Sequence, residues 1–206
     1  MTKQLNTRAV EFFHLLQNSR FTSAANHAIP TTTAEEAAIR MLLNTALYGA
    51  NVFIVGNRGN SAVSNQIITD LRNIAHLSAI PLHQSSVLAC FANDGGYEQS
   101  FVMQLEKIAR PHDVLIAISN SGQAENIINS AMFMKRISAR VITLTGFEAN
   151  NPLRMLGDIN YWVDSSDNGY VEIAHLFLLH HWADCLATKL ANDRSKNSAS
   201  DIRCTG

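Results

Sequence analysis

NVFIVGNRGNS at residues 51–61 and DVLIAISNSGQ at residues 113–123 carry the strongest structural signal in this 206-residue chain. Each stretch joins a run of apolar residues to a short polar turn that contains glycine, and each turn leads into a segment with helical periodicity. An apolar run without alternation is typical of a strand that is buried on both faces, as in a parallel sheet. The two stretches therefore predict two parallel strands, each followed by a helix.

Further segments repeat this alternation of strand and helix. The remaining candidate strands are AIPLH (79–83), ARVITLTG (139–146) and INYWVD (159–164), and the candidate helices between strands are 61–76, 98–110 and 123–137. We predict an α/β fold, a three-layer αβα sandwich around a five-stranded, flavodoxin-like parallel sheet of order 2-1-3-4-5. The run SSVLACFAN (85–93) fits either an extra strand or a buried helix, because its periodicity favours neither.

Helical segments flank this core on both sides and define the predicted domain. Residues 3–18 and 33–48 show helical patterns, with Thr33 as a candidate N-cap and Gly49 as a candidate stop. Residues 170–190 are apolar nearly all round, which predicts a helix buried on most sides. We expect one domain over 1–190, with N-terminal helices in 1–49, an αβα core in 50–190 and a disordered polar tail over 191–206.

Composition excludes several classes of protein. Lys and Arg number 16 against 17 Asp and Glu, so the net charge is −1, which argues against a nucleic-acid-binding domain. Cys90, Cys185 and Cys204 are odd in number and form no CxxC motif, so neither a disulfide framework nor a cysteine zinc site is expected. No apolar run reaches the roughly 18 residues of a membrane span, and no signal peptide is visible. We therefore predict a cytoplasmic protein without a membrane partner.

The polar turns after the two central strands predict a ligand site. Ligands of open parallel sheets bind at the carboxyl ends of the strands where the strand order reverses, and GNRGNS and SNSGQ follow the two strands on either side of that point. Backbone N–H groups at helix N-termini favour anions, and the hydroxyls of Ser119 and Ser121 add donors. Arg58 stands where a dinucleotide motif needs its second glycine, so a compact phosphate ester fits better than a nucleotide cofactor.

A second group of polar residues lies on helical segments. Gln66 and Asp70 are four residues apart and share a helix face. The polar residues of the apolar C-terminal helix include Glu172, His175, His180 and His181. Glu172 and His180 are separated by about 12 Å along a regular helix, so either that helix is irregular or two chains each supply one residue. His175 and His181 also fit ordinary core or interface histidines.

The motifs GNRGNS, ANDGGYE, DVLIAISNSG and VITLTG occur in an order that resembles the SIS (sugar isomerase) domain, in particular its phosphoheptose isomerase branch, over about residues 35–190. The resemblance implies a homotetramer with sites between subunits, which agrees with the apolar helices and with the low charged fraction of 16%. It also implies isomerisation of sedoheptulose 7-phosphate to a heptose 7-phosphate.

The resemblance assigns roles to residues of the two turns and of the helices. For the substrate, it implies that Ser119, Asn120 and Ser121 hold the phosphate with Gln123 close by, that Asn57, Gly59, Asn60 and Ser61 line the sugar, and that Asp94 contacts its hydroxyls. For catalysis it implies Asp70 and His180 as the acid–base pair, with Glu172 as a second carboxylate. For a divalent metal, zinc or a harder cation, it implies the ligands Gln66, Asp70, Glu172 and His180.

This chain departs from the family pattern at four of these places. Gln66 replaces a His, Asp70 a Glu, Glu172 a Gln and Ala124 a Ser of the phosphate loop. Gln is a much poorer zinc ligand than His, and a carboxylate withdrawn by about 1 Å can cost roughly 100-fold in rate.

Three functions therefore stay open. The first is a phosphoheptose isomerase. The second is a non-catalytic member that binds a phosphosugar or, like one relative in this branch, the replication initiator. The third is an isomerase or epimerase of another phosphosugar.

Overall fold

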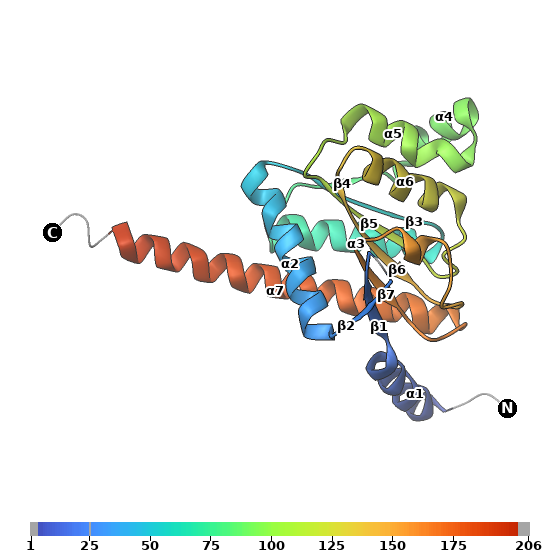
Figure 1. Cartoon of the computed structure of the whole chain (residues 1–206), viewed down its shortest axis with the longest axis horizontal. Coiled ribbons are helices and arrows are strands. Elements are labelled where there is room, and N and C mark those ends of the chain that lie inside the picture. The colour runs from blue at the N-terminus through green and yellow to red at the C-terminus, as the bar shows by residue number, and fades with distance from the viewer. Residues whose placement is uncertain (1–3, 25, 202–206) are drawn as a thin grey trace.

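A computed structural model describes residues 4–24 and 26–201 and centres on a seven-stranded sheet of order β2-β1-β7-β6-β5-β3-β4 (Figure 1). The strands are β1 Arg20–Ser23, β2 Ala28–Ile29, β3 Val52–Gly56, β4 Ala79–Pro81, β5 Val114–Ser119, β6 Arg140–Thr145 and β7 Ile159–Trp162. The series β4-β3-β5-β6-β7 is parallel and in the predicted order. The predicted layers and order are confirmed, and the count of five strands is wrong.

The two additional strands lie at the β7 edge of the sheet. β1 pairs antiparallel with β7, and β2 pairs antiparallel with β1. β1 has four residues and β2 has two. Among these six residues, Phe21 has the only buried apolar side chain. So short a segment has no apolar periodicity of its own, which is why the sequence pattern did not predict it.

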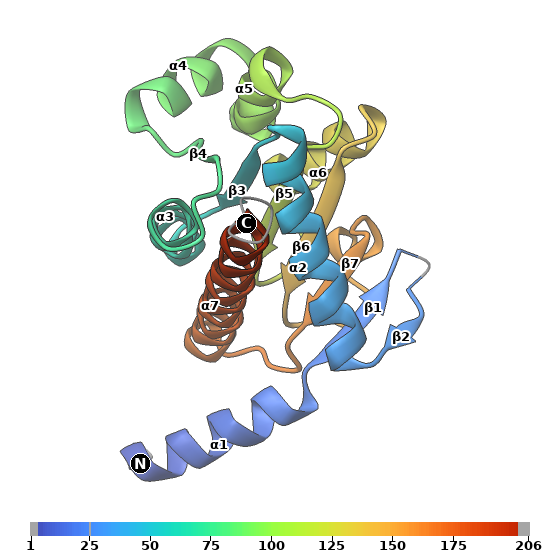
Figure 2. The same cartoon turned by 90° about the vertical axis from the view of Figure 1, so that its left-hand side faces the viewer.

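Helices cover both faces of the sheet. They are α1 Leu5–Asn18, α2 Thr31–Tyr48, α3 Gly59–Asn73, α4 Ser85–Gly95, α5 Ser100–Ile108, α6 Glu125–Arg136 and α7 Asn168–Asp201, with short 3-10 turns at Tyr97–Gln99 and Leu153–Met155. Figure 2 shows α2, α3 and α7 on one face and α5 and α6 on the other. Successive residues of β3 alternate between the two cores: Val52 and Ile54 join the first, Phe53 and Val55 the second. The continuous apolar run is thus explained by burial on both faces.

Several predicted boundaries are corrected by the structure. α2 begins at Thr31 after Pro30 rather than at Thr33, and Gly49 ends it in the left-handed conformation as expected, with φ 60°. The ambiguous run 85–93 forms α4, a helix with no fully buried residue.

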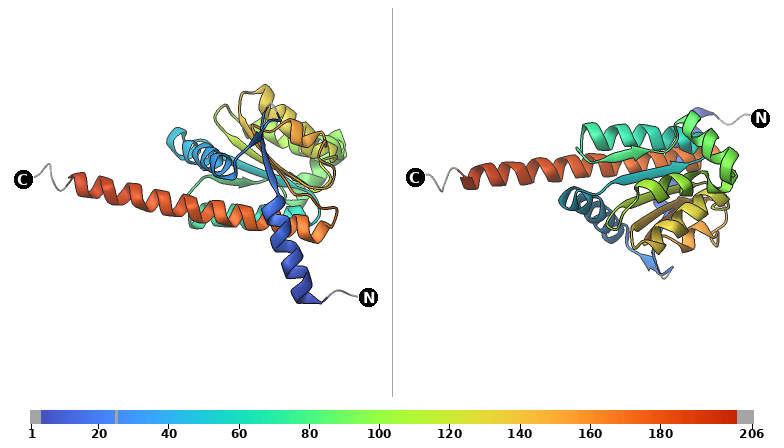
Figure 3. Two further views of the ribbon diagram at one scale, coloured as in Figure 1. Left: turned by 60° about the horizontal axis from the view of Figure 1, so that its bottom comes forward. Right: turned by 90° about the horizontal axis from the view of Figure 1, so that it is seen from above.

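The expected tail forms helix over much of its length. α7 continues to Asp201 and extends beyond the sandwich (Figure 3), so disorder from residue 191 is wrong for 191–201. Residues 202–206 of the expected tail lie outside the described residues. Within the part of the chain that the structure describes, no helix has the length and apolar character of a membrane span.

Candidate functional site

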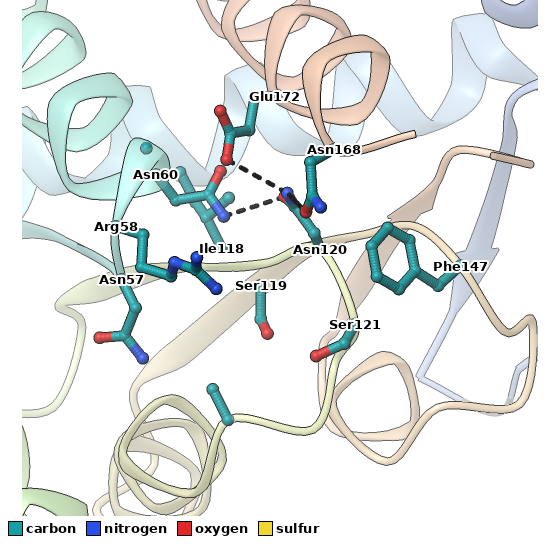
Figure 4. Close-up of a pocket in the computed structure, with 12 residues that line it drawn as sticks. Asn57, Arg58, Asn60, Ile118, Ser119, Asn120, Ser121, Phe147, Asn168 and Glu172 are labelled. Atoms are coloured by element: carbon teal, nitrogen blue, oxygen red, sulfur yellow. Dashed lines mark hydrogen bonds between the residues drawn. The ribbon is translucent and has the colours of Figure 1, made fainter. Parts of the chain in front are cut away.

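A cavity of about 490 Å³ opens at the carboxyl ends of β3 and β5, the predicted switch point (Figure 4). Its lining comes from the two polar turns, from the residue before α6, from the turn after β6 and from the start of α7. The lining residues are Asn57, Arg58, Gly59, Asn60, Ile118, Ser119, Asn120, Ser121, Ala124, Phe147, Asn168 and Glu172. The two loops selected from sequence therefore meet at one site.

The first turn is tight, and its backbone has little freedom. A Cβ on Gly56 would lie 2.7 Å from the Cβ of Asn60, so only glycine fits where β3 ends. Arg58 has φ 55° and ψ −124°, a conformation that glycine adopts and other residues rarely do. Ser61 does not line the cavity. Its hydroxyl donates to the carbonyl oxygen of Arg58 at 2.6 Å and holds the turn.

The second turn brings two hydroxyls to the cavity. Gly122 has φ 65°, and its N–H donates to the carbonyl oxygen of Ser119 at 3.0 Å. A Cβ at Gly122 would overlap the side chain of Asn151. This compact turn places Ser119 and Ser121 on one side of the cavity (Figure 4). Gln123 is exposed and lies outside the lining.

Carboxamide side chains connect the two turns to the start of α7. Asn60 Nδ2 donates to Asn120 Oδ1 at 2.9 Å. Asn120 Nδ2 in turn donates to Asn168 Oδ1 at 2.9 Å and to Glu172 Oε1 at 3.3 Å. Glu172, predicted as a catalytic or metal-binding carboxylate, is thus part of the cavity wall.

A reciprocal pair of carboxamides anchors Asn57. Its Nδ2 donates to Asn126 Oδ1 at 2.8 Å, and Asn126 Nδ2 donates back to Asn57 Oδ1 at 3.0 Å. The hydroxyl of Tyr97 donates to the same Asn57 oxygen at 2.9 Å. Asn126 and Tyr97 were not selected from sequence. They lie 69 and 40 residues from Asn57, and no local pattern indicates the contact.

Gln66, Asp70 and His180 form a separate group on the seam between α3 and α7, which run side by side (Figure 2). His180 Nδ1 lies 2.7 Å from Asp70 Oδ2, and Gln66 Nε2 donates to Asp70 Oδ1 at 3.1 Å. None of the three lines the cavity. Because α7 is a continuous helix over this span, Glu172 stays about 12 Å from His180 along the axis.

The four predicted metal ligands do not fit one ion in this chain. Glu172 accepts a hydrogen bond from Asn120, whereas Asp70 and Gln66 are engaged with each other and with His180 two helical turns away. Among the described residues, no group of three or more His, Cys, Asp or Glu side chains could hold a metal.

Asp94 does not reach the cavity either. It lies exposed near the end of α4, where Cys90 and Asn93 are its hydrogen-bond partners. Asp94 is not among the residues that line the cavity, and its contact with substrate hydroxyls stays a prediction.

The histidines near the site fall into different classes. His175 is fully buried, its Nε2 donates to the carbonyl oxygen of Thr145 at 3.2 Å, and burial lowers its pKa to about 4. His175 is therefore a core residue. His181 lies 3.5 Å from Glu35 on α2. His83, which sequence reasoning missed, lies 2.8 Å from the Gly56 carbonyl oxygen, and burial lowers its pKa.

Known proteins share both the sequence pattern and the fold. A phosphoheptose isomerase of Helicobacter pylori (strain Shi470) is 28% identical over 161 residues, covering 75% of this chain and 83% of the relative. The phosphoheptose isomerase structure from Francisella tularensis has a TM-score of 0.78 at 22% identity and covers 91% of this chain and all (100%) of that one. The Vibrio vulnificus NanR protein complexed with ManNAc-6P has a TM-score of 0.62 at 15% identity, covering 98% of this chain and 69% of that one.

The SIS domain description matches residues 21–146, which include both turns of the cavity and the first three parallel strands of the sheet, together with β6. This match extends over more than half of the 206 residues. Its region contains the two turns of the cavity, and the lining residues Phe147, Asn168 and Glu172 follow it in the chain. The chain belongs to the SIS domain family.

Proposed function

We propose that this protein binds a sugar phosphate in the cavity between β3 and β5 and isomerises it between aldose and ketose forms. The observation that carries the proposal is the meeting of two donor-rich turns, with Ser119 and Ser121 on one and Arg58 on the other, at the carboxyl ends of adjacent strands. Donors at such a position recognise a phosphate group. The names of its relatives support isomerase chemistry. Sedoheptulose 7-phosphate, implied by the sequence resemblance, is the first substrate to test.

The acid–base work is assigned to Asp70 and His180. Isomerisation needs a base for a carbon-bound proton and an acid for the carbonyl oxygen, and these two side chains lie 2.7 Å apart. With the phosphate at Ser119 and Ser121, we infer that the carbon chain extends past Glu172 along the α3–α7 seam. The side chain of His180 is 43% exposed and that of Asp70 is 18% exposed, so the imidazole is the more accessible group of the pair.

Turnover of sedoheptulose 7-phosphate by the wild type, with and without added Zn²⁺ or Mg²⁺, tests the proposal. Asp70→Asn should lower kcat by about 100-fold or more, because general acid–base catalysis contributes roughly 10²–10⁴-fold. Ser119→Ala combined with Ser121→Ala should mainly raise KM. Asp184→Asn, an exposed position further along α7, is the matched control and should leave both constants unchanged.

A second candidate function is the binding of a sugar phosphate without catalysis. The separation of the predicted metal ligands in the structure favours it. A protein of this fold has been solved with a phosphosugar bound, ManNAc-6P, without being named an isomerase. Binding of sugar phosphates without turnover under any metal would establish this function. Absence of binding would contradict both.

A further inference from the structure

The cavity is chemically two-sided, and its second side carries unpaired acceptors. One side presents donors: the hydroxyls of Ser119 and Ser121, and the guanidinium of Arg58, which extends across the cavity toward Ser119 (Figure 4). The other side presents Glu172 and Asn60. Among the described residues, neither Arg58 nor Glu172 forms an ion pair.

The carboxylate of Glu172 sets the direction of the hydrogen bonds on that second side. A carboxylate only accepts, so Asn120 must turn its Nδ2 toward Glu172 and its Oδ1 toward Asn60. Asn60 must then turn its Nδ2 toward Asn120, which leaves its own Oδ1 facing away. That oxygen is buried without a hydrogen-bond partner, in a side chain only 4% exposed. A buried acceptor without a donor is costly, which indicates a missing partner.

The positions of Asn60 and Glu172, which both bond to Asn120, indicate which kind of donor group is missing. Both residues also line the cavity. One hydroxyl donates a single proton and satisfies only one of them, whereas a protonated amino group donates three. The amino group also supplies a positively charged partner for the carboxylate of Glu172. The wall is therefore more complementary to an ammonium group than to a hydroxyl.

The strained backbone conformation of Arg58 indicates that its side chain has a role in ligand binding. Its φ of 55° and ψ of −124° are strained for any residue with a Cβ, so glycine would fit this turn better. The guanidinium of Arg58 lies in the same cavity as the hydroxyls of Ser119 and Ser121, and these three groups together are donors for a phosphate dianion.

From these two sides we propose that the cavity selects a phosphorylated amino sugar, with the phosphate on Arg58, Ser119 and Ser121 and the ammonium group on Glu172 and Asn60. The inference rests on the proposed function, because it places a sugar phosphate in the same cavity. It narrows the substrate class from neutral sugar phosphates, sedoheptulose 7-phosphate included, to those with a free amino group.

Titration calorimetry with three hexose derivatives tests the selection: glucosamine 6-phosphate, glucose 6-phosphate and N-acetylglucosamine 6-phosphate. EDTA in the buffer keeps divalent cations from the same oxygen atoms. The wild type should bind glucosamine 6-phosphate at least about tenfold more tightly than the other two, as expected for one charge-assisted interaction. Sedoheptulose 7-phosphate should bind no more tightly than glucose 6-phosphate.

Two variants test the acceptor side and the donor side of the cavity separately. Glu172→Gln should bring the ratio between the amino and hydroxy sugars to about one, because a neutral carboxamide can itself donate to Asn60 Oδ1. Arg58→Gly should weaken all three ligands by about tenfold or more and keep their ratio, while the Tm rises by about 2 °C or more as the strain is relieved.

Two matched controls complete the experiment. Glu106→Gln removes an exposed carboxylate on α5 and should change no affinity. Ser138→Gly relieves another positive φ, 63°, far from the cavity, and should raise the Tm without changing the affinities.

The outcomes distinguish the inference from the proposed function. Equal binding of amino and hydroxy sugars by the wild type, or a preference that survives in Glu172→Gln, overturns the amino-sugar inference and leaves the sugar-phosphate proposal intact. Failure of all four sugar phosphates to bind overturns both.

Discussion

His175 is a single buried residue whose protonation is coupled to folding. Its imidazole is completely buried on the sheet side of α7, and its pKa is lowered to about 4 because burial disfavours the charged form. In the unfolded chain the same group titrates near its ordinary value of about 6.5. Between these two pKa values the unfolded state binds more protons, so the free energy of unfolding falls as the pH decreases.

We expect this group to lower the stability by about 2 kcal/mol between about pH 7.5 and about pH 5. His83, whose pKa is also lowered by burial, acts in the same direction. His175→Gln keeps a donor for the Thr145 carbonyl and removes the titration, so it should lose less stability over this range than the wild type. Urea unfolding at both pH values measures the difference. An equal loss in the two proteins would contradict the assignment.

Asn160 connects three elements at the β7 edge of the sheet, where β1 and β2 pair in antiparallel orientation. This fully buried side chain on β7 accepts hydrogen bonds from Thr143 on β6 and from the N–H of Gly157, and it donates to three backbone carbonyls in β1 and in the turn before β7. The β1–β2 hairpin is therefore attached by a specific polar contact in addition to the strand pairing.

Asn160→Ala should lower the free energy of unfolding by about 2–4 kcal/mol, because it leaves several buried donors and acceptors without partners. Chemical denaturation measures the loss. Asn150→Ala, at an exposed position in the turn after β6, should change stability by less than about 0.5 kcal/mol. Similar values for the two variants would show that the hairpin does not depend on Asn160.

The whole molecule exposes large apolar side chains on the helices that were expected to contact another chain. α1 buries none of its residues fully, and it exposes Val10 by 57% and Phe13 by 56%. Figures 1 and 2 show α1 projecting from the sandwich. A helix of this length is marginal in water without tertiary packing. The homotetramer stays a prediction that this surface supports.

Light scattering should therefore give a mass that is a multiple of the 22.7 kDa chain. Phe13→Asp should shift the mass toward the monomer, because a charge cannot be buried in an apolar interface without a partner. Gln17→Asp adds the same charge at an exposed polar position of α1 and should leave the mass unchanged. A monomeric wild type would contradict the expectation.

Local patterns sufficed for the sheet and for the cavity loops. The apolar runs of β3 and β5 indicate strands buried on both faces, and consecutive βα units can be connected in few ways, so the parallel order and the switch point follow. Asn57, Asn60, Ser119 and Ser121 line the cavity because they directly follow those strands, and their contacts with a substrate stay a prediction.

Contacts between distant segments required the folded structure. Whether Glu172 meets Asp70 and His180 depends on how α3 packs against α7, and the rise of a regular helix keeps Glu172 at the cavity and His180 on the seam. The orientation of Asn60 likewise depends on Asn120, a partner 60 residues away. Sequence spacing describes neighbours along one element, whereas these side chains meet through packing between elements, and that packing makes one wall of the cavity an acceptor.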